Sequence, residues 1–479
     1  MITTARQGKT VEDSLGKIIL PHGAYYGIST QRALENFPIT NYQLHPELIK
    51  AIAMVKKAAA HANKELLERK APGIFQYIVN ACDAIIDGYY HEHFVVDPIQ
   101  GGAGTSLNMN ANEVIANIAL VEMGHEKCLN AIVNPYDHVN MSQSTNDVIP
   151  TAARICIRKL LDELLTTMAG LRDIFAEKVV EFDTVVKMGR THLQDAVPIR
   201  LGQEFDAYLR VLTRDIDRIR KTGNYLYEVN LGATAVGTAL NANPDYVREV
   251  IEQLRKITGF DELKRCESLV DGTQNTDCFT EVSAALKICA INMSKIANDL
   301  RLMASGPRCG LGEITLEKLQ PGSSIMPEKV NPILPELINQ VAFQVIGNDL
   351  TVSLASEAGQ FELNVMQPVL VFNLIQSVSM MNNAFKVFGE KCVKKISLSE
   401  NNLKQLKSYV EESPIIATAL TPYIGYERAG AIARIALEEK TTALALCLQN
   451  EDLINRLGGE ENVRKILDPD AMTRMGENL

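Results

Sequence analysis

Five long stretches of helical apolar periodicity constrain the fold of this chain more than any other feature. In the first, apolar residues from Ile157 to Phe175 recur by threes and ones, which is the spacing of one helical face. We see no β-rich region and no repeat of fixed period in the 479 residues, so the sequence predicts a mainly α fold. The five predicted helices cover roughly 157–182, 201–219, 277–304, 332–355 and 368–388.

Several of these helices are apolar on most of their faces. In the third, Phe279 and Leu286 lie on one side of the helix axis, and Ile288 and Ile291 lie on other sides. Helices with such broad apolar surfaces are buried on several sides. Each predicted helix is about 30–40 Å long at 1.5 Å per residue, which is more than a short domain at either end can cover. We therefore expect helices of other subunits to cover the remainder, so that the protein is an obligate homo-oligomer.

Composition and charge exclude several classes of function. The net charge is −10 and the basic residues are dispersed, which argues against a nucleic-acid partner. No apolar stretch reaches membrane-spanning length without polar interruption, and the N-terminus lacks the apolar core of a signal peptide. The nine cysteines are scattered and include no CxxC pair, so we interpret them as reduced thiols of a cytoplasmic protein.

Four polar clusters separate the helical stretches. The last closes on Asn331-Pro332, which predicts a helix start because asparagine caps helices well and proline is favoured at their first position. A helix N-terminus attracts anions through its free N–H groups and its dipole. The clusters are 100–113 (QGGAGTSLNMNANE), 142–147 (SQSTND), 189–195 (GRTHLQD) and 322–331 (GSSIMPEKVN), and the last is called the signature loop below.

Each cluster also has a structural interpretation. The signature loop has the composition of an ordinary connector, and 100–113 could be a capped helix start whose polar groups satisfy one another. The segment 305–320, with four glycines or prolines, is a candidate mobile lid. His91 and His93 have no partner cluster, so packing explains them better than a metal site.

The clusters are rich in hydrogen-bond donors and poor in free carboxylates, and Lys329 adds a permanent cation. Such groups suit a small substrate rich in carboxylate oxygens. We find no redox fingerprint, no Ser-His-Asp motif and no metal-ligand cluster, which leaves acid–base chemistry on a carboxylate substrate. A serine can act as the base only if its alkoxide is strongly stabilised in a closed, dry loop. The signature loop contains the ingredients for this.

The signature loop resembles the G-S-x-x-M-x-x-K-x-N signature of the aspartase/fumarase superfamily. The other three clusters also resemble superfamily motifs, in the same order, and the resemblance covers nearly the whole chain. Thr145, Leu193 and Ile333 make the chain more similar to the aspartate ammonia-lyases than to the fumarate hydratases. Two positions depart from the family pattern: Glu328, which we expect to point to solvent, replaces a small residue, and Ala239 replaces a usual glycine.

The resemblance implies roles for the residues of the signature loop. Ser323 would be the base that removes the C3 proton of L-aspartate, and Ser324 would hold the loop on a substrate carboxylate. Lys329 and Asn331 would bind a carboxylate, with Thr191 supporting them.

The resemblance also assigns the other clusters to the substrate. Thr105, Ser144 and Thr145 would clamp the β-carboxylate, whose enediolate form carries the developing charge. Asn146 and His192 would lie near the departing ammonium, although a capping or packing histidine remains an alternative on the residues alone.

Outside the clusters, Arg32 is a weaker candidate for the substrate region, and a surface arginine is at least as consistent with its position.

The architecture implied by the resemblance has three domains: 1–143, a central five-helix bundle at 144–396, and a small helical domain at 397–479. It implies a homotetramer with active sites shared between subunits, and we predict no cofactor and no metal. The expected reaction is the reversible conversion of L-aspartate to fumarate and ammonia. Fumarate hydratase is the main alternative, a lyase with a bulkier leaving group is more distant, and a catalytically inactive helical scaffold is the competing non-enzymatic hypothesis.

Overall fold

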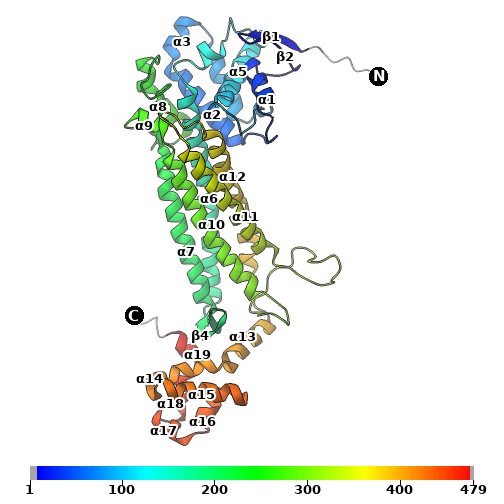
Figure 1. Cartoon of the computed structure of the whole chain (residues 1–479), viewed down its shortest axis with the longest axis vertical. Helices are drawn as coiled ribbons and strands as arrows, with labels where there is room; N and C mark the ends of the chain where they lie inside the picture. Colours follow the sequence, from blue (N-terminus) through cyan, green and yellow to red (C-terminus); the bar gives the residue numbers. More distant parts are fainter. Residues whose placement is uncertain (1–7, 475–479) are drawn as a thin grey trace. The chain divides into compact units, whose positions relative to one another are not determined.

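The structure is a computed structural model that describes residues 8–474, and helices dominate it (Figure 1). The predicted mainly α fold is confirmed, and all five long helices are present. The ends of four of them lie within four residues of the predicted ones, whereas the first begins at Thr145, twelve residues before its predicted start. They contain 37, 23, 27, 25 and 25 residues. Their bounds are α6 (Thr145–Glu181), α7 (Leu201–Gly223), α10 (Asp277–Met303), α11 (Ile333–Glu357) and α12 (Gln367–Lys391).

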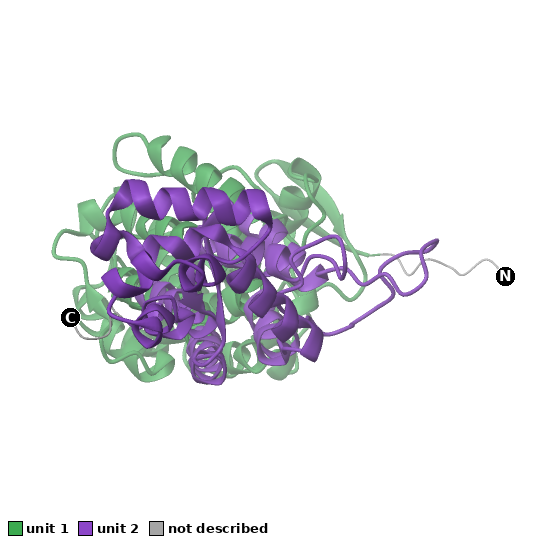
Figure 2. Ribbon diagram, turned by 90° about the horizontal axis from the view of Figure 1, so that it is seen from below, with its two compact units in different colours: residues 1–165, 217–288, 343–382 green, residues 166–216, 289–342, 383–479 purple. Residues whose placement is uncertain are grey.

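The chain forms two compact units (Figure 2), and each long helix contributes residues to both. Unit 1 comprises residues 1–165, 217–288 and 343–382. Unit 2 comprises residues 166–216, 289–342 and 383–479. The division into three domains stays a prediction.

In unit 1, helix packing around α2 builds the core. Helix α2 contacts α4 and α8, and α5 packs against α4, so that α5 is buried along nearly its whole length from Leu107 to Leu120. The strands of this unit form one antiparallel hairpin, β1–β2, and one short parallel pair, β5–β6. The elements are β1 (Lys9–Asp13), β2 (Gly16–Leu20), α1 (Ile28–Asn36), α2 (Pro46–Ala62), α3 (Lys64–Lys70), α4 (Phe75–Ile86), α5 (Thr105–Glu122), β5 (Glu228–Val229), α8 (Pro244–Thr258), β6 (Lys264–Arg265) and α9 (Leu269–Gln274).

A buried carboxylate fixes the start of α1. Helix α1 has no side-chain cap of its own, and Glu113 from α5 accepts hydrogen bonds from the backbone N–H groups of Gly27, Ser29 and Thr30 at 2.8–3.1 Å. The hydroxyl of Thr30 donates to the same carboxylate at 2.6 Å. Glu113 thus satisfies donors that the first helical turn leaves free, and its charge lies favourably at the positive end of the helix.

In unit 2, the sequence analysis missed a β-hairpin formed by β3 (Val186–Thr191) and β4 (Gln194–Arg200). The ladder shifts register between Met188 and Arg190. His192 and Leu193 form the connecting turn, with φ angles of 55° and 60°. Two successive positive φ angles match the twist of a tight hairpin turn.

The C-terminal part of unit 2 consists of short helices, as the broken periodicity after residue 397 predicts. They enclose a core of their own that includes Leu420, Cys447 and Val463, each fully buried. The helices are α13 (Glu400–Glu412), α14 (Thr421–Ile424), α15 (Tyr426–Glu439), α16 (Ala443–Leu448), α17 (Glu451–Arg456), α18 (Glu460–Ile466) and α19 (Pro469–Thr473).

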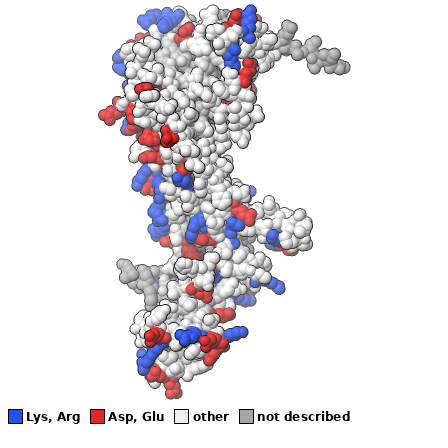
Figure 3. Space-filling model, viewed as in Figure 1, with Lys and Arg blue, Asp and Glu red and all other residues white. Residues whose placement is uncertain are grey.

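Helix α11 leaves an apolar stripe uncovered in unit 1. Phe343, Leu350 and Leu354 are 64%, 61% and 60% exposed, and Gly347 lies between them on the same face. On the molecular face in view, both basic and acidic side chains are spread over the surface (Figure 3). Within residues 8–474, no helix combines the length and the apolar character needed to cross a membrane.

Candidate active site

The first group of predicted site residues lies in unit 1, at the starts of two helices. Thr105 is the first residue of α5 and is exposed. Gly104, which precedes it, has a φ of 89°, and a Cβ there would lie 3.1 Å from the Ile149 side chain. Both the backbone conformation and the close contact therefore favour glycine at this position. Thr145 likewise begins α6 and is almost fully buried, and Ser144 directly precedes it.

A buried carboxylate holds the 142–147 cluster against the small-residue loop at 232–238. Asp147 accepts hydrogen bonds from the backbone N–H of Ser144 at 3.0 Å and from those of Gly232 and Thr234 at 3.1 and 3.0 Å. Burial raises the pKa of Asp147 to about 6, and these hydrogen bonds oppose the rise. Asp147 thus positions residues 144–146 rather than facing a ligand.

The amide nitrogen of the Asn146 side chain also has a hydrogen-bond partner within unit 1. Its amide nitrogen donates to the carbonyl oxygen of Ala235 at 2.8 Å, and its backbone N–H donates to the hydroxyl oxygen of Ser144 at 3.2 Å. This orientation leaves the carbonyl oxygen of the Asn146 amide available as an acceptor.

The second group lies in unit 2 and begins with the β3–β4 hairpin. Thr191 ends β3 and His192 starts the turn, and both are exposed. Directly before them, Lys187 and Arg190 both contact the fully buried carboxylate of Glu313. This cluster connects the hairpin to the segment that leads into the signature loop.

Lys187 also bridges to α7. Its ammonium lies 2.7 Å from a carboxylate oxygen of Glu313 and 2.9 Å from one of Glu204, and its side chain is 2% exposed. Burial raises the pKa of Glu204, while the nearby Lys187 lowers it. Removing one partner of a buried ion pair leaves the other charge uncompensated, which strongly destabilises the fold.

The predicted lid, 305–320, is anchored in its middle. The hydroxyl of Tyr409 donates to the carbonyl oxygen of Leu311 at 3.2 Å, and the amide of Asn402 donates to that of Gly312 at 2.6 Å. Thr315 and Ser397 exchange two backbone hydrogen bonds at 2.9 and 3.1 Å. Helix α13 and the residues before it therefore hold 311–315 in place.

The signature loop is closed on itself. The N–H of Gly322 donates to the carbonyl oxygen of Lys329 at 2.9 Å, and the amide nitrogen of Asn331 donates to the carbonyl oxygen of Gly322 at 2.7 Å. A Cβ on Gly322 would lie 2.4 Å from the Lys329 oxygen, so only glycine fits there. The predicted helix start at Asn331-Pro332 was one residue early, because α11 begins at Ile333 and the Asn331 side chain closes the loop instead.

Within this loop, two backbone donors converge on Ser323. Its hydroxyl oxygen accepts hydrogen bonds from the N–H groups of Ile325 and Met326 at 3.2 and 3.0 Å. Donors of this kind stabilise the negatively charged form of an oxygen. Ser324 and Lys329 are exposed, and Figure 2 shows the loop extending away from the rest of unit 2.

Glu328 points to solvent, as expected. Its side chain is 89% exposed, and its carboxylate lies 3.3 Å from the ammonium of Lys318. Its φ angle is 64°, a conformation that a small residue such as glycine adopts more easily.

Comparison with known proteins decides the family. Residues 16–347 match the family described as Lyase, and residues 416–474 match the one described as fumarase C C-terminus. An aspartate ammonia-lyase of Bacillus subtilis (strain 168) is 58% identical over 476 residues, which cover 99% of this chain and 98% of that protein. The chain belongs to the aspartase/fumarase superfamily.

Two solved structures agree with the superfamily fold. The fumarate lyase:delta crystallin from Brucella melitensis, bound to cobalt, has a TM-score of 0.91 and 46% identity, covering 97% of this chain and 99% of that chain. The recombinant class II fumarase from Schistosoma mansoni has a TM-score of 0.90 and 33% identity, with the same coverage of both chains. In our protein, no group of three or more His, Cys, Asp or Glu side chains within residues 8–474 could hold a metal ion.

The superfamily motifs fall into two sets in this structure. Unit 1 contains Thr105, Ser144, Thr145 and Asn146, and unit 2 contains Thr191, His192, Ser323, Ser324, Lys329 and Asn331. Within unit 1, the buried Asn108 side chain contacts Thr145, which is a link that the sequence analysis did not identify.

Arg32 turned out to be engaged in unit 1. Its guanidinium donates to the carboxylate of Asp13 at 2.8 and 2.6 Å and to the carbonyl oxygen of Gly16 at 3.0 Å. It therefore holds the β1–β2 turn, which supports the structural interpretation of this arginine.

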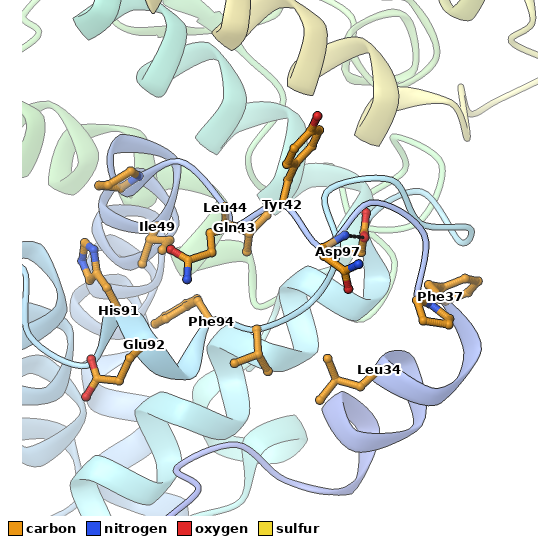
Figure 4. A pocket seen from close by; sticks show the side chains of 14 residues that line it. Leu34, Phe37, Tyr42, Gln43, Leu44, Ile49, His91, Glu92, Phe94 and Asp97 are labelled. Carbon is orange, nitrogen blue, oxygen red and sulfur yellow. Dashed lines mark hydrogen bonds between the residues drawn. The ribbon is translucent and has the colours of Figure 1, made fainter.

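A pocket of about 480 Å³ in unit 1 is separate from these superfamily motifs (Figure 4). None of the predicted site residues lines it. At its edge, the carboxylate of Asp97 already accepts hydrogen bonds from Thr40, Asn41 and Ile99. Most of its lining is apolar and includes Leu34, Phe37, Leu44, Ile49 and Phe94.

Proposed function

We propose that this protein catalyses the reversible deamination of L-aspartate to fumarate and ammonia. The observation that carries the proposal is the 58% identity to an aspartate ammonia-lyase over nearly the full length of both proteins. Identity to the class II fumarase from Schistosoma mansoni is lower, at 33%.

In the proposed reaction, Ser323 acts as the base. Its alkoxide takes the proton from C3 of L-aspartate, and the electron pair of that C–H bond moves into the β-carboxylate to form an enediolate. The enediolate then collapses to fumarate as the C–N bond breaks and ammonia leaves. The two N–H groups that donate to the Ser323 oxygen support this role, because they lower the energy of the alkoxide.

Other residues of unit 2 would bind the substrate. Lys329 supplies a positive charge for a carboxylate, with Ser324 and Thr191 as neutral donors. The Asn331 amide nitrogen has two hydrogens, and only one is needed for the bond to Gly322. The second remains available to a substrate carboxylate.

Residues of unit 1 would stabilise the enediolate and the leaving group. Thr105, Ser144 and Thr145 donate to the β-carboxylate, where the negative charge increases as the proton leaves. The free carbonyl oxygen of Asn146 suits an ammonium, and His192 of unit 2 would also lie near this leaving group.

We further propose a homotetramer whose active sites are shared between subunits. The uncovered stripe of Phe343, Leu350 and Leu354 on α11 supports assembly, because large contiguous apolar patches mark interaction surfaces. None of the nine cysteines, all of which lie within the described residues, forms a disulfide, and most are buried; this is consistent with a reducing compartment, so we propose the cytoplasm. Sedimentation at low micromolar concentration is expected to give a tetramer, and a stable monomer would contradict this proposal.

The activity itself is tested by following fumarate absorbance with L-aspartate or L-malate as the sole substrate. We expect fumarate to appear only with L-aspartate. Formation of fumarate only from L-malate would favour a hydratase. Absence of activity with both substrates would favour the inactive scaffold.

A further inference from the structure

A buried lysine lies behind the predicted carboxylate clamp in unit 1. Lys56, on α2, is 1% exposed, and no carboxylate of the described chain pairs with it at ion-pair distance. Its ammonium instead donates to the amide oxygens of Asn140 and Gln143, each at 2.9 Å. Those residues are 84 and 87 positions away in the sequence.

This lysine sets the direction of a chain of hydrogen bonds. A lysine ammonium has three donors and no acceptor, so the Asn140 amide must turn its oxygen toward Lys56. The same oxygen accepts from the amide nitrogen of Asn108 at 3.2 Å, which fixes the orientation of Asn108. The Asn108 nitrogen in turn donates to the hydroxyl oxygen of Thr145 at 3.2 Å.

The last member of the chain is therefore a donor. Because the Thr145 oxygen accepts from Asn108, its hydrogen has to point elsewhere, and no other side chain of the described residues accepts it. Thr145 is one of the three residues predicted to clamp the β-carboxylate. A carboxylate of the substrate is an acceptor-only group that matches this free hydrogen.

Two buried amide oxygens show that the surroundings impose the direction of these hydrogen bonds. The amide oxygens of Asn108 and Asn112 have no hydrogen-bond partner among the described residues, although both side chains are buried. Turning either amide over would place its oxygen against the Asn140 oxygen, where both now place a nitrogen at 3.2 Å. An amide orientation is assigned from its surroundings, and here the donor-only lysine leaves a single choice.

We propose that Lys56 is a positioning residue that, through Asn140 and Asn108, makes Thr145 an obligate hydrogen-bond donor to a substrate carboxylate. The proposal rests on the proposed function in one respect, namely that Thr145 binds a carboxylate. It adds three residues that act on the reaction from behind the substrate-binding surface.

Calorimetric titration of the full-length assembled protein with fumarate tests this proposal. We expect Lys56→Met to raise the Kd for fumarate roughly tenfold or more, which is the loss of about one hydrogen bond to a charged group. In turnover, KM for L-aspartate should rise more than kcat falls. The matched control is Lys57→Met, because Lys57 is the next residue on α2 and pairs with Asp83 instead. Its Kd should equal that of the wild type.

The outcomes separate the two proposals. Equal Kd values for Lys56→Met and the wild type would overturn the positioning role while leaving the proposed function intact. Absence of binding of both fumarate and L-malate to the wild type would overturn the proposed function and this inference with it.

A double-mutant cycle provides a second test that does not need a folded Lys56 variant. Asn108→Leu and Thr145→Val should each raise the Kd for fumarate, and the double variant should bind no more weakly than Thr145→Val alone. Additive effects would show that Asn108 does not act through Thr145.

The pH dependence of fumarate binding should also reveal the role of Lys56. Burial lowers the pKa of Lys56 to about 7, and the facing Asp147 on α6 and Cys82 on α4 partly oppose this. The dicarboxylate favours the protonated lysine, so the Kd for fumarate should be steady just below pH 7 and rise above it. Lys56→Met should lose this rise, and an unchanged pH profile in that variant would contradict the assignment.

Discussion

Replacing Ser323 with alanine is expected to lower kcat for L-aspartate by about 10²–10⁴-fold, the usual contribution of a positioned base. The variant loses the only atom that takes the C3 proton in the proposed mechanism. Among the described residues, the Ser323 side chain accepts hydrogen bonds only from the N–H groups of Ile325 and Met326 in its own loop, so the assembly should remain intact. Steady-state kinetics combined with sedimentation measures both effects.

Ser324→Ala is the matched control for this experiment. Ser324 is exposed, and it is assigned to hold the loop on the substrate. Its removal should mainly raise KM. A larger loss of kcat in Ser324→Ala than in Ser323→Ala would exchange the roles of the two serines, and near-native turnover in Ser323→Ala would show that neither the loop geometry nor the family motif identifies the base.

Lys187→Met is expected to lower the free energy of unfolding by about 3 kcal/mol, the lower end of the cost of breaking a buried ion pair. The substitution leaves the Glu313 carboxylate, which is 0% exposed, with Arg190 alone, and it removes the cation that pairs with Glu204. The Glu313 carboxylate would then be poorly compensated in a site that excludes water, and the partly exposed Glu204 would lose its cation. Denaturant unfolding gives the change directly.

An exposed ion pair in the same unit serves as the control for Lys187→Met. Lys407 and Glu411 on α13 are 73% and 55% exposed, so Lys407→Met should change the stability by less than about 1 kcal/mol. Equal losses in the two variants would contradict the view that burial makes the Glu313 cluster important.

The long helices could be predicted from the sequence because their periodicity extends over many turns. Apolar residues from Ile157 to Phe175 recur with the helical spacing, and no competing structure satisfies so long a pattern. The helix starts at Thr105 and Thr145 could also be anticipated, since polar clusters with capping residues precede them.

The β3–β4 hairpin could not be predicted in the same way. Its turn is made by His192 and Leu193, which do not have the glycine or asparagine that normally marks a tight hairpin turn. Lys187 is buried in β3, and the ladder shifts register near Arg190, so the strand shows no clean alternation of polar and apolar residues. Tertiary ion pairs, which local patterns do not encode, stabilise this hairpin.

The candidate site, like the fold, could be predicted from the sequence only in part. The family motif identifies which residues are concerned, yet it says nothing about the partners that orient them. In the sequence, nothing distinguishes Lys56 from the other polar residues of an amphipathic helix. Only the three-dimensional structure connects it to Asn140 and Thr145. Asn331 was interpreted as a helix cap because local composition cannot distinguish a cap from a side chain that closes a loop.

In the proposed mechanism, the closed signature loop has a consequence for the entropy lost in each catalytic cycle. The hydrogen bonds from Gly322 and Asn331 tie the two ends of the loop together, and those on Ser323 shape its interior. A loop that keeps its internal shape can approach a substrate as one body. The conformational entropy of ordering its residues is then lost once, when the chain folds, and not again at every turnover.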